Sequence, residues 1–174
     1  MKRTVLAALA LAGAATSAAP AQTLSADDLN SRLIHRRAVE AVIWGMSAVN
    51  TDLMYREMVK LGGKPNQIVY WPGLPDWKNQ TLTPNPDAIY LMPFVNTKET
   101  GPVVIEIPPA DGGSITGTIM DIWQTPLADV GPAGTDAGKG GKYLMLPPDY
   151  TGEIPPGYFT YRSGTYGVFV FWRG

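Results

Sequence analysis

The chain has 174 residues and a formal net charge of −1, and its length fits one domain of ordinary size. It contains no cysteine, which excludes disulfides, thiol nucleophiles and thiolate metal sites. The near-neutral charge, without a basic cluster, argues against nucleic acid or an anionic membrane surface as a partner.

Residues 1–21 have the layout of a secretory signal peptide. Lys2 and Arg3 form the charged start, Val5–Ala15 the apolar stretch, and Ala19–Ala21 a small-residue cleavage site. The apolar stretch is shorter than the roughly 20 residues that cross a bilayer, and no later segment approaches that length. We therefore expect a mature chain without a membrane span, located in the periplasm or secreted.

Residues 22–63 are predicted to form an N-terminal helical segment. Ser25–Asp28 provides a capping serine followed by acidic residues that suit the positive end of a helix dipole. Apolar residues then recur at spacings compatible with a 3.6-residue period, and Gly62–Gly63 supplies a stop. Gly45 and Asn50–Asp52 are positions at which the segment could divide, so we expect a helical hairpin.

Residues 64–174 are predicted to form a β-sandwich domain. Val69–Trp77 contains several turn-forming residues and is expected to be a structured loop. Beyond it, runs of β-branched and aromatic residues are bounded by glycine or proline. The fold class is therefore α+β, with N-terminal helices packed on an antiparallel, jelly-roll-like β-sandwich. The strands are predicted near Ile89–Met92, Val103–Ile107, Ile115–Trp123, Lys142–Leu146, Tyr158–Tyr161 and Tyr166–Trp172.

The sequence stops at Phe171–Gly174, within or just after a predicted strand. An apolar edge strand without cover invites aggregation. We therefore expect this chain to be the front part of a longer protein, truncated at its C-terminal end.

The segment Thr83–Tyr90 combines two prolines with a polar cluster. Each proline fixes its own φ and favours extended geometry in the residue before it, so Asn85 is held in a stiff loop. Asp87 follows in the same loop. Such a loop suits a binding site, and it equally suits a turn that only needs anchoring.

Four motifs together resemble a known bacterial family, Domain of Unknown Function 1254 (DUF1254). The resemblance covers most of the chain after the signal peptide. It implies a β-sandwich with helices at the front, a secreted or envelope location, and often a second domain, DUF1214, after the first. It implies no settled activity. The motifs are Thr83-Pro84-Asn85-x-Asp87-x-x-Tyr90, Gly101–Val104, Asp121-x-Trp123 and Gly138-x-Gly140-Gly141-x-Tyr143-Leu144.

The chain departs from the family pattern at several polar positions. Ala88 stands where the family usually has threonine, and Asn96 where it often has an acidic residue. Gly131–Gly134 lacks the arginine and threonine that are common in the family's glycine loop. We interpret Gly131–Gly141 as a flexible hairpin or lid, because it lacks the glycine and serine or threonine positions of a phosphate-binding loop.

Asp87 and Asp121 are the candidate catalytic residues. Asp121 interrupts an otherwise apolar strand face, where an aspartate needs a hydrogen-bond partner or a shifted pKa. If the two carboxylates face each other, they can act as general acid and base. The alternative is that Asp121 accepts hydrogen bonds from main-chain N–H groups and that Asp87 closes a turn.

A calcium site has no support from ligand spacing, and the single histidine, His35, excludes a three-histidine zinc site.

The candidate ligand-binding residues are aromatic and polar side chains of the predicted loops. Aromatic planes stack on sugars and apolar ligands, and Trp71 is predicted to lie in a loop rather than in the core. The alternative is that Trp71 seals a junction between helix and sheet. The full candidate set is Trp71, Asn85, Asp87, Tyr90 and Trp123.

These features predict a non-catalytic envelope protein that binds a small or saccharide-like ligand, with no cofactor and no metal. Assembly with a C-terminal DUF1214-like domain, or as a homo-oligomer, is a further expectation. The alternative is a carboxylate-dependent enzyme of the glycoside hydrolase or lyase type, which uses Asp87 and Asp121.

Overall fold

The structure is a computed structural model that describes residues 24–78 and 85–174. The predicted signal peptide, Thr83 and Pro84 lie outside these residues. The chain divides into two units, Met1–Glu40 and Ala41–Gly174.

The described part of the first unit is the start of helix α1 (Ala26–Lys60). Ser25 caps it as predicted. The Ser25 hydroxyl accepts a hydrogen bond from the Asp28 N–H (3.1 Å), and the Asp28 carboxylate accepts one from the Ser25 N–H (3.1 Å). Two N–H groups at the helix start are thereby satisfied reciprocally.

Helix α1 is continuous, so the expected helical hairpin is not formed. Thr51 does not cap a second helix, because its hydroxyl donates to the Ser47 carbonyl one turn earlier (3.0 Å). The predicted stop is confirmed. Gly62 has a φ of 90°, and the Gly63 N–H donates to the Met58 carbonyl (3.0 Å), which ends the helix.

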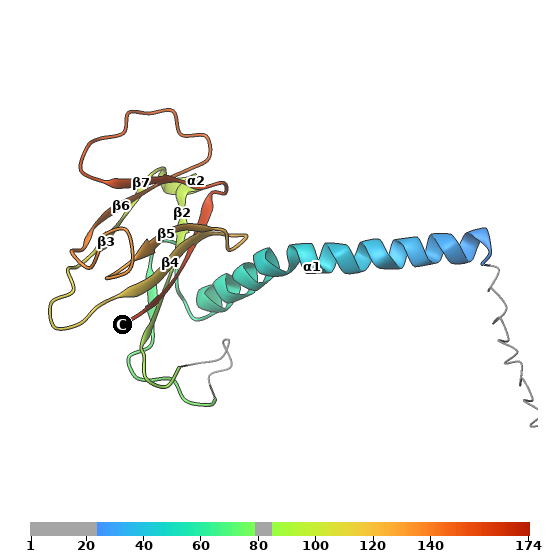
Figure 1. Cartoon of the computed structure of the whole chain (residues 1–174), viewed down its shortest axis with the longest axis horizontal. Helices are drawn as coiled ribbons and strands as arrows, with labels where there is room; N and C mark the ends of the chain where they lie inside the picture. The colour runs from blue at the N-terminus through green and yellow to red at the C-terminus, as the bar shows by residue number, and fades with distance from the viewer. Residues whose placement is uncertain (1–23, 79–84) are drawn as a thin grey trace, which may run out of the picture. The chain divides into compact units, whose positions relative to one another are not determined.

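Eight strands of the second unit form two sheets (Figure 1). The five-stranded sheet has the order β1-β2-β8-β4-β5, and the three-stranded sheet has the order β3-β6-β7. A short helix, α2 (Thr97–Thr100), follows β2. The strands are β1 (Ile68–Tyr70), β2 (Tyr90–Asn96), β3 (Val103–Ile107), β4 (Thr116–Asp121), β5 (Pro126–Val130), β6 (Gly141–Leu146), β7 (Phe159–Arg162) and β8 (Gly167–Arg173).

The predicted fold class is confirmed. All strand pairs are antiparallel among the described residues except β6–β7, which is parallel. The connection of residues 147–158 is long enough for the crossover that a parallel pair needs.

The prediction missed two strands. β1 has only three residues inside the expected loop, and β5 begins at Pro126, a residue more typical of a strand start or edge than of a strand interior.

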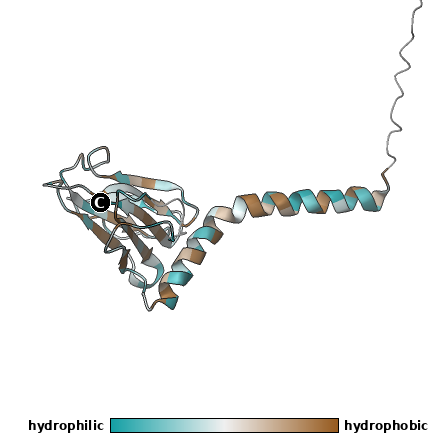
Figure 2. Ribbon diagram, turned by 90° about the horizontal axis from the view of Figure 1, so that it is seen from below, coloured by the Kyte–Doolittle hydropathy of each residue, from teal (hydrophilic) through white to brown (hydrophobic). Residues whose placement is uncertain are grey.

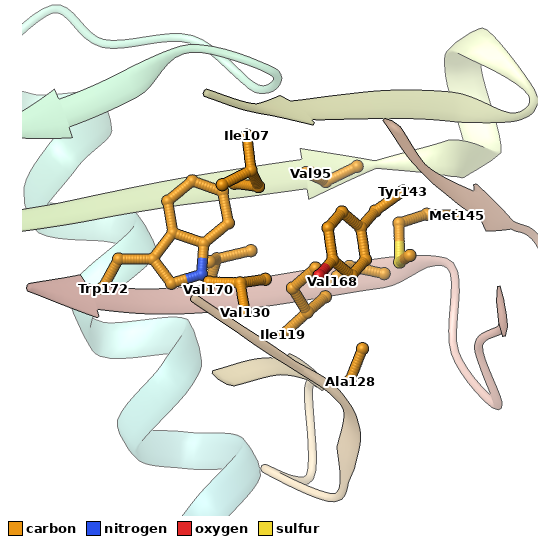
Figure 3. Close-up of a cluster of buried hydrophobic side chains, with 10 residues drawn as sticks. All are labelled: Val95, Ile107, Ile119, Ala128, Val130, Tyr143, Met145, Val168, Val170 and Trp172. Atoms are coloured by element: carbon orange, nitrogen blue, oxygen red, sulfur yellow. The ribbon is translucent and has the colours of Figure 1, made fainter. Parts of the chain in front are cut away.

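Apolar side chains from both sheets meet in one core (Figure 3). Val168, Val170 and Trp172 of β8 alternate along one face of the five-stranded sheet. Tyr143 and Met145 of β6 reach this core from the other sheet, and both are fully buried. The two sheets therefore pack as a sandwich.

A second cluster lies on the other face of the five-stranded sheet. Met92 and Phe94 of β2 and Phe169 of β8 pack there against Met58 of α1. Tyr55 of α1 meets the Phe94 ring edge-on, with a centroid distance of 5.8 Å. The second half of α1 thus covers part of this sheet face, and it forms one wall of two concave surfaces.

Candidate functional site: a cleft between helix and sheet

Asn85 forms hydrogen bonds within its own turn and with Tyr90, the first residue of β2. The Asn85 side-chain oxygen accepts a hydrogen bond from the Asp87 N–H (2.9 Å), which closes an Asx turn. The Asn85 N–H donates to the Tyr90 hydroxyl (2.8 Å). Asp87 itself is exposed. These contacts anchor the loop, in agreement with the second interpretation of its proline pattern.

Trp71 and Tyr90 form the junction between β1 and β2. Their rings meet edge-on at 6.4 Å, and the Trp71 N–H donates to the Tyr90 carbonyl (3.1 Å). Tyr90 is buried, and the Arg173 guanidinium lies 5.7 Å from its ring centre. Trp123 packs instead on Trp44 of α1, with a ring distance of 4.6 Å. The predicted aromatic residues are therefore dispersed and do not form one site.

Asp121 organises the turn after β4. One carboxylate oxygen accepts from the Trp123 N–H (2.8 Å) and the Thr125 N–H (3.0 Å). This buried aspartate is satisfied by main-chain donors, as its placement on an apolar strand requires.

The strand register separates Asp121 from Asp87. Asp121 pairs with Val168 at the start of β8, whereas Tyr90, just after Asp87, pairs with Arg173 at its end. The distance along β8 from Val168 to Arg173 is about 17 Å at about 3.3 Å per residue. The structure does not bring the two candidate carboxylates together.

The helix–sheet cleft is a concave surface of about 280 Å³. It lies between α1, the C-terminal end of β2, and the start of β8. No residue of the predicted site lines it. Its lining residues are Ala48, Thr51, Asp52, Tyr55, Phe94, Val95, Asn96, Lys98, Ile122, Tyr166, Gly167 and Val168.

Local structure positions the polar groups of the helix–sheet cleft. Asn96 caps α2 by accepting from the Lys98 N–H (3.0 Å) with its side-chain oxygen, so its NH₂ group is available to the cleft. The Lys98 ammonium lies 5.9 Å from the Tyr166 ring centre. In the part of the chain that the structure describes, neither this ammonium nor the Tyr55 hydroxyl has a hydrogen-bonding or ionic partner in the protein.

Other polar groups of the cleft are already engaged. The Asp52 carboxylate pairs with Arg56 (2.6 Å), and the Thr51 hydroxyl donates within its helix. The Tyr166 hydroxyl donates to the Asp149 carboxylate (2.8 Å), and this bond raises the pKa of Tyr166. Tyr166 therefore stays an uncharged phenol, and its ring can stack on a ligand.

The lining of the helix–sheet cleft is better suited to binding than to catalysis. It contains no histidine, cysteine or serine, and Asp52 is its single carboxylate. Among residues 24–78 and 85–174, no group of three histidine, cysteine, aspartate or glutamate side chains is placed to hold a metal ion. An aromatic surface with one amide and one ammonium recognises a small polar ligand by stacking and hydrogen bonds.

Trp71 lines a second concave surface, the Trp71 groove, on α1 and the β1–β2 edge. Its volume is about 330 Å³ and its lining is mainly apolar. Of the five predicted ligand-binding residues, this groove contains Trp71 alone. It is lined by Asn50, Leu53, Met54, Glu57, Met58, Leu61, Val69, Trp71, Met92 and Phe94.

Asp136 holds the glycine-rich segment of residues 131–141 in place by hydrogen bonds. The sequence did not indicate this role of Asp136. This buried carboxylate accepts hydrogen bonds from the Gly131 N–H (2.7 Å), the Gly140 N–H (3.1 Å) and the Tyr143 hydroxyl (2.8 Å). The expectation of a flexible lid is wrong, because both ends of the segment are tied to one side chain.

Residues 65–174 match the family described as "Protein of unknown function (DUF1254)". The chain belongs to the DUF1254 family. No curated protein gives a significant match. The chain is similar in fold to a solved structure, the VPA0106 protein from Vibrio parahaemolyticus, with 23% sequence identity and a TM-score of 0.57. The similarity covers 76% of this chain and 31% of that chain.

The DUF1254 match spans the β-sandwich and leaves out α1. Of the helix–sheet cleft, it therefore includes the β2, α2 and β8 walls but not the α1 wall. Among the described residues, no helix has the combination of length and apolar character that a bilayer crossing requires.

Sequence reasoning missed the residues of the helix–sheet cleft. Tyr55 lies in α1, Asn96 and Lys98 lie at the start of α2, and Tyr166 lies just before β8. These three segments are far apart in the sequence, and no local motif connects them. Asn96 did carry a signal, since it departs from the family pattern. The predicted packing of the N-terminal helices on the β-sandwich did not indicate which strand ends α1 would cover, and therefore not that it would lie beside Asn96.

Proposed function

We propose that this DUF1254 protein binds a small saccharide-like ligand in the helix–sheet cleft, as a periplasmic or secreted protein. The observation that carries the proposal is the juxtaposition of Tyr55 and Tyr166 with the amide of Asn96 and the ammonium of Lys98, which forms no hydrogen bond or ion pair among the described residues. Sugars present apolar ring faces and hydroxyl groups, and such a lining matches both.

The size of the cleft supports a ligand of one or two sugar rings. Its volume of about 280 Å³ is just below the roughly 300 Å³ at which the range of small-molecule sites begins, so only a small ligand fits. The proposed location rests on the signal-peptide pattern of residues 1–21. A carboxylate-pair mechanism is not proposed, because Asp87 and Asp121 lie at opposite ends of the five-stranded sheet.

The proposal predicts that at least one simple saccharide binds and that Lys98→Ala weakens its binding about 10- to 100-fold. This range corresponds to the loss of one hydrogen bond from a charged donor. Titration calorimetry with glucose, N-acetylglucosamine, their disaccharides and muropeptide fragments measures the dissociation constants.

Lys139→Ala is the matched control. Lys139 is exposed and lies in the glycine-rich segment, outside the lining of the cleft, and its removal is expected to leave the affinity unchanged. If no compound binds, or if both lysine variants bind equally well, the proposal is wrong. The Lys98 N–H, which bonds to Asn96, is kept in the alanine variant, so the cap of α2 survives.

A further inference from the structure

Trp44 of α1 and Trp123 of the turn between β4 and β5 form an aromatic pair within the second unit. Their ring centres are 4.6 Å apart, with 42° between the ring planes. Trp44 is nevertheless 71% exposed, and Trp123 is half-buried. Apolar residues recur along α1 (Figure 2), so exposure alone does not mark a site on this helix. The contact with a turn of the sheet, and the position of this turn, distinguish Trp44.

The aromatic pair continues the helix–sheet cleft on both of its walls. Ala48 and Thr51 line the cleft from α1, and at about 100° per residue Trp44 falls within about 40° of both. Trp44 lies one turn before Ala48, about 6 Å along the helix axis at about 1.5 Å per residue. On the opposite wall, Trp123 directly follows Ile122, which also lines the cleft. A ligand that extends from the cleft towards the start of α1 therefore meets the two indole rings.

The turn that carries Trp123 is fixed by the protein itself. The buried Asp121 carboxylate accepts hydrogen bonds from the N–H groups of Trp123 and Thr125. The Gln124 side-chain amide donates to the Thr51 hydroxyl of α1 (3.4 Å), which ties the turn to the helix. A ring that is already held in place loses little conformational entropy when it stacks on a ligand, so the turn is preorganised for binding.

The extent of this surface identifies the class of ligand. The cleft alone is sized for one or two sugar rings. Indole offers a large apolar plane, which matches the apolar face of a further ring. We propose that the Trp44–Trp123 pair is an outer subsite of the helix–sheet cleft, and that the ligand is an oligosaccharide of at least three rings with one end in the cleft. This inference rests on the proposed function, and it specifies a saccharide chain over a free monosaccharide or disaccharide.

Titration calorimetry with β-1,4-linked oligomers of N-acetylglucosamine and of glucose, two to five rings long, tests the outer subsite. We expect the pentasaccharide to bind about 10-fold more tightly than the disaccharide. Trp44→Ala is expected to weaken pentasaccharide binding about 3- to 10-fold, because it removes one stacking contact, and to leave disaccharide binding within about twofold. Trp44→Phe keeps an aromatic ring and is expected to bind the pentasaccharide within about twofold of the wild type.

Trp77→Ala is the matched control. Trp77 is 82% exposed and lines neither the cleft nor the Trp71 groove, so its removal is expected to leave both affinities unchanged. Circular dichroism verifies that each variant is folded. Equal loss of disaccharide and pentasaccharide binding in Trp44→Ala would overturn the outer subsite, since the pair would then act on the cleft itself.

Lys98→Ala separates this inference from the proposed function, because it is expected to weaken short and long chains alike. If the disaccharide binds and depends on Lys98, but Trp44→Ala binds the pentasaccharide like the wild type, the cleft is a saccharide site without an outer subsite and the inference is wrong. The same holds if the pentasaccharide binds no more tightly than the disaccharide. If no oligomer of any length binds, the proposed function and the inference are both wrong.

Discussion

Replacement of Asp136 by alanine is expected to lower the free energy of unfolding by about 4 kcal/mol. Its carboxylate accepts hydrogen bonds from Gly131, Gly140 and Tyr143, and the residue is only 4% exposed. Each buried donor that loses its partner costs about 1–3 kcal/mol, and part of this is recovered where water enters. Urea denaturation followed by circular dichroism measures the change.

Two further substitutions separate the hydrogen-bond network from a general effect of mutation. Tyr143→Phe removes one of the three donors and is expected to cost about 1–2 kcal/mol. Asp111→Ala changes an exposed aspartate in another loop and is expected to cost less than about 0.5 kcal/mol. A loss for Asp136→Ala no larger than that for Asp111→Ala would contradict the proposed role of the network.

The same network predicts a pH dependence. Burial alone would raise the pKa of Asp136, but the hydrogen bonds from Tyr143, Gly131 and Gly140 outweigh it and hold this pKa below its usual value of 3.8. A group with a lowered folded-state pKa contributes stability above its unfolded pKa, and this contribution is lost as the pH falls through the folded value. Burial and the neighbouring Asp136 both raise the pKa of Tyr143, so the tyrosine remains a donor throughout.

The stability of the wild type is therefore expected to fall more steeply below pH 4 than that of Asp136→Asn, whose amide does not titrate. Because all other carboxylates are common to both proteins, their contributions cancel in the comparison. If the free energies of unfolding of the wild type and Asp136→Asn fell with the same slope between pH 5 and pH 2, Asp136 would not be held ionised in the folded state.

Gly117→Ala is expected to cost about 3 kcal/mol. Gly117 lies in β4 with a φ of 144°, a region that other residues rarely adopt. A Cβ atom there would lie 2.1 Å from the Phe171 carbonyl oxygen of β8, a main-chain atom in the centre of the sheet. Strain and overpacking each contribute about 1–3 kcal/mol at such a position, and the strand cannot move without loss of its pairing.

Gly113→Ala is the control for this substitution. Gly113 has no positive φ, and a Cβ atom on it would meet nothing within 4 Å. The change is expected to be neutral or to stabilise by up to about 1 kcal/mol through the unfolded state. Thermal unfolding measures the melting temperatures of Gly113→Ala and Gly117→Ala. Equal melting temperatures would contradict the close packing of β4 on β8.

The candidate site shows where sequence reasoning fails. The polar loop at Asn85 and Asp87 has the composition of a binding loop, but that composition also builds an Asx turn, and the structure contains the turn. Asp121 was predicted to need a partner, and that need is met by main-chain N–H groups of the next turn. A sequence can thus show that a polar group must be satisfied, but the fold decides what satisfies it.

The family, the fold class and the ends of α1 were determined by sequence, because capping residues, stop glycines and two-residue alternation are local signals. The parallel pairing of β7, the buried Asp136 network and the helix–sheet cleft were decided only by tertiary structure. The β6–β7 pairing and the helix–sheet cleft depend on contacts between residues that the chain brings together from distant positions. The partners of Asp136 are near it in sequence, but the fold decides that its side chain is buried among their donors. Asn96 and Tyr166, for example, are 70 residues apart in sequence, yet both line one cleft because β2 and β8 are neighbours in the sheet.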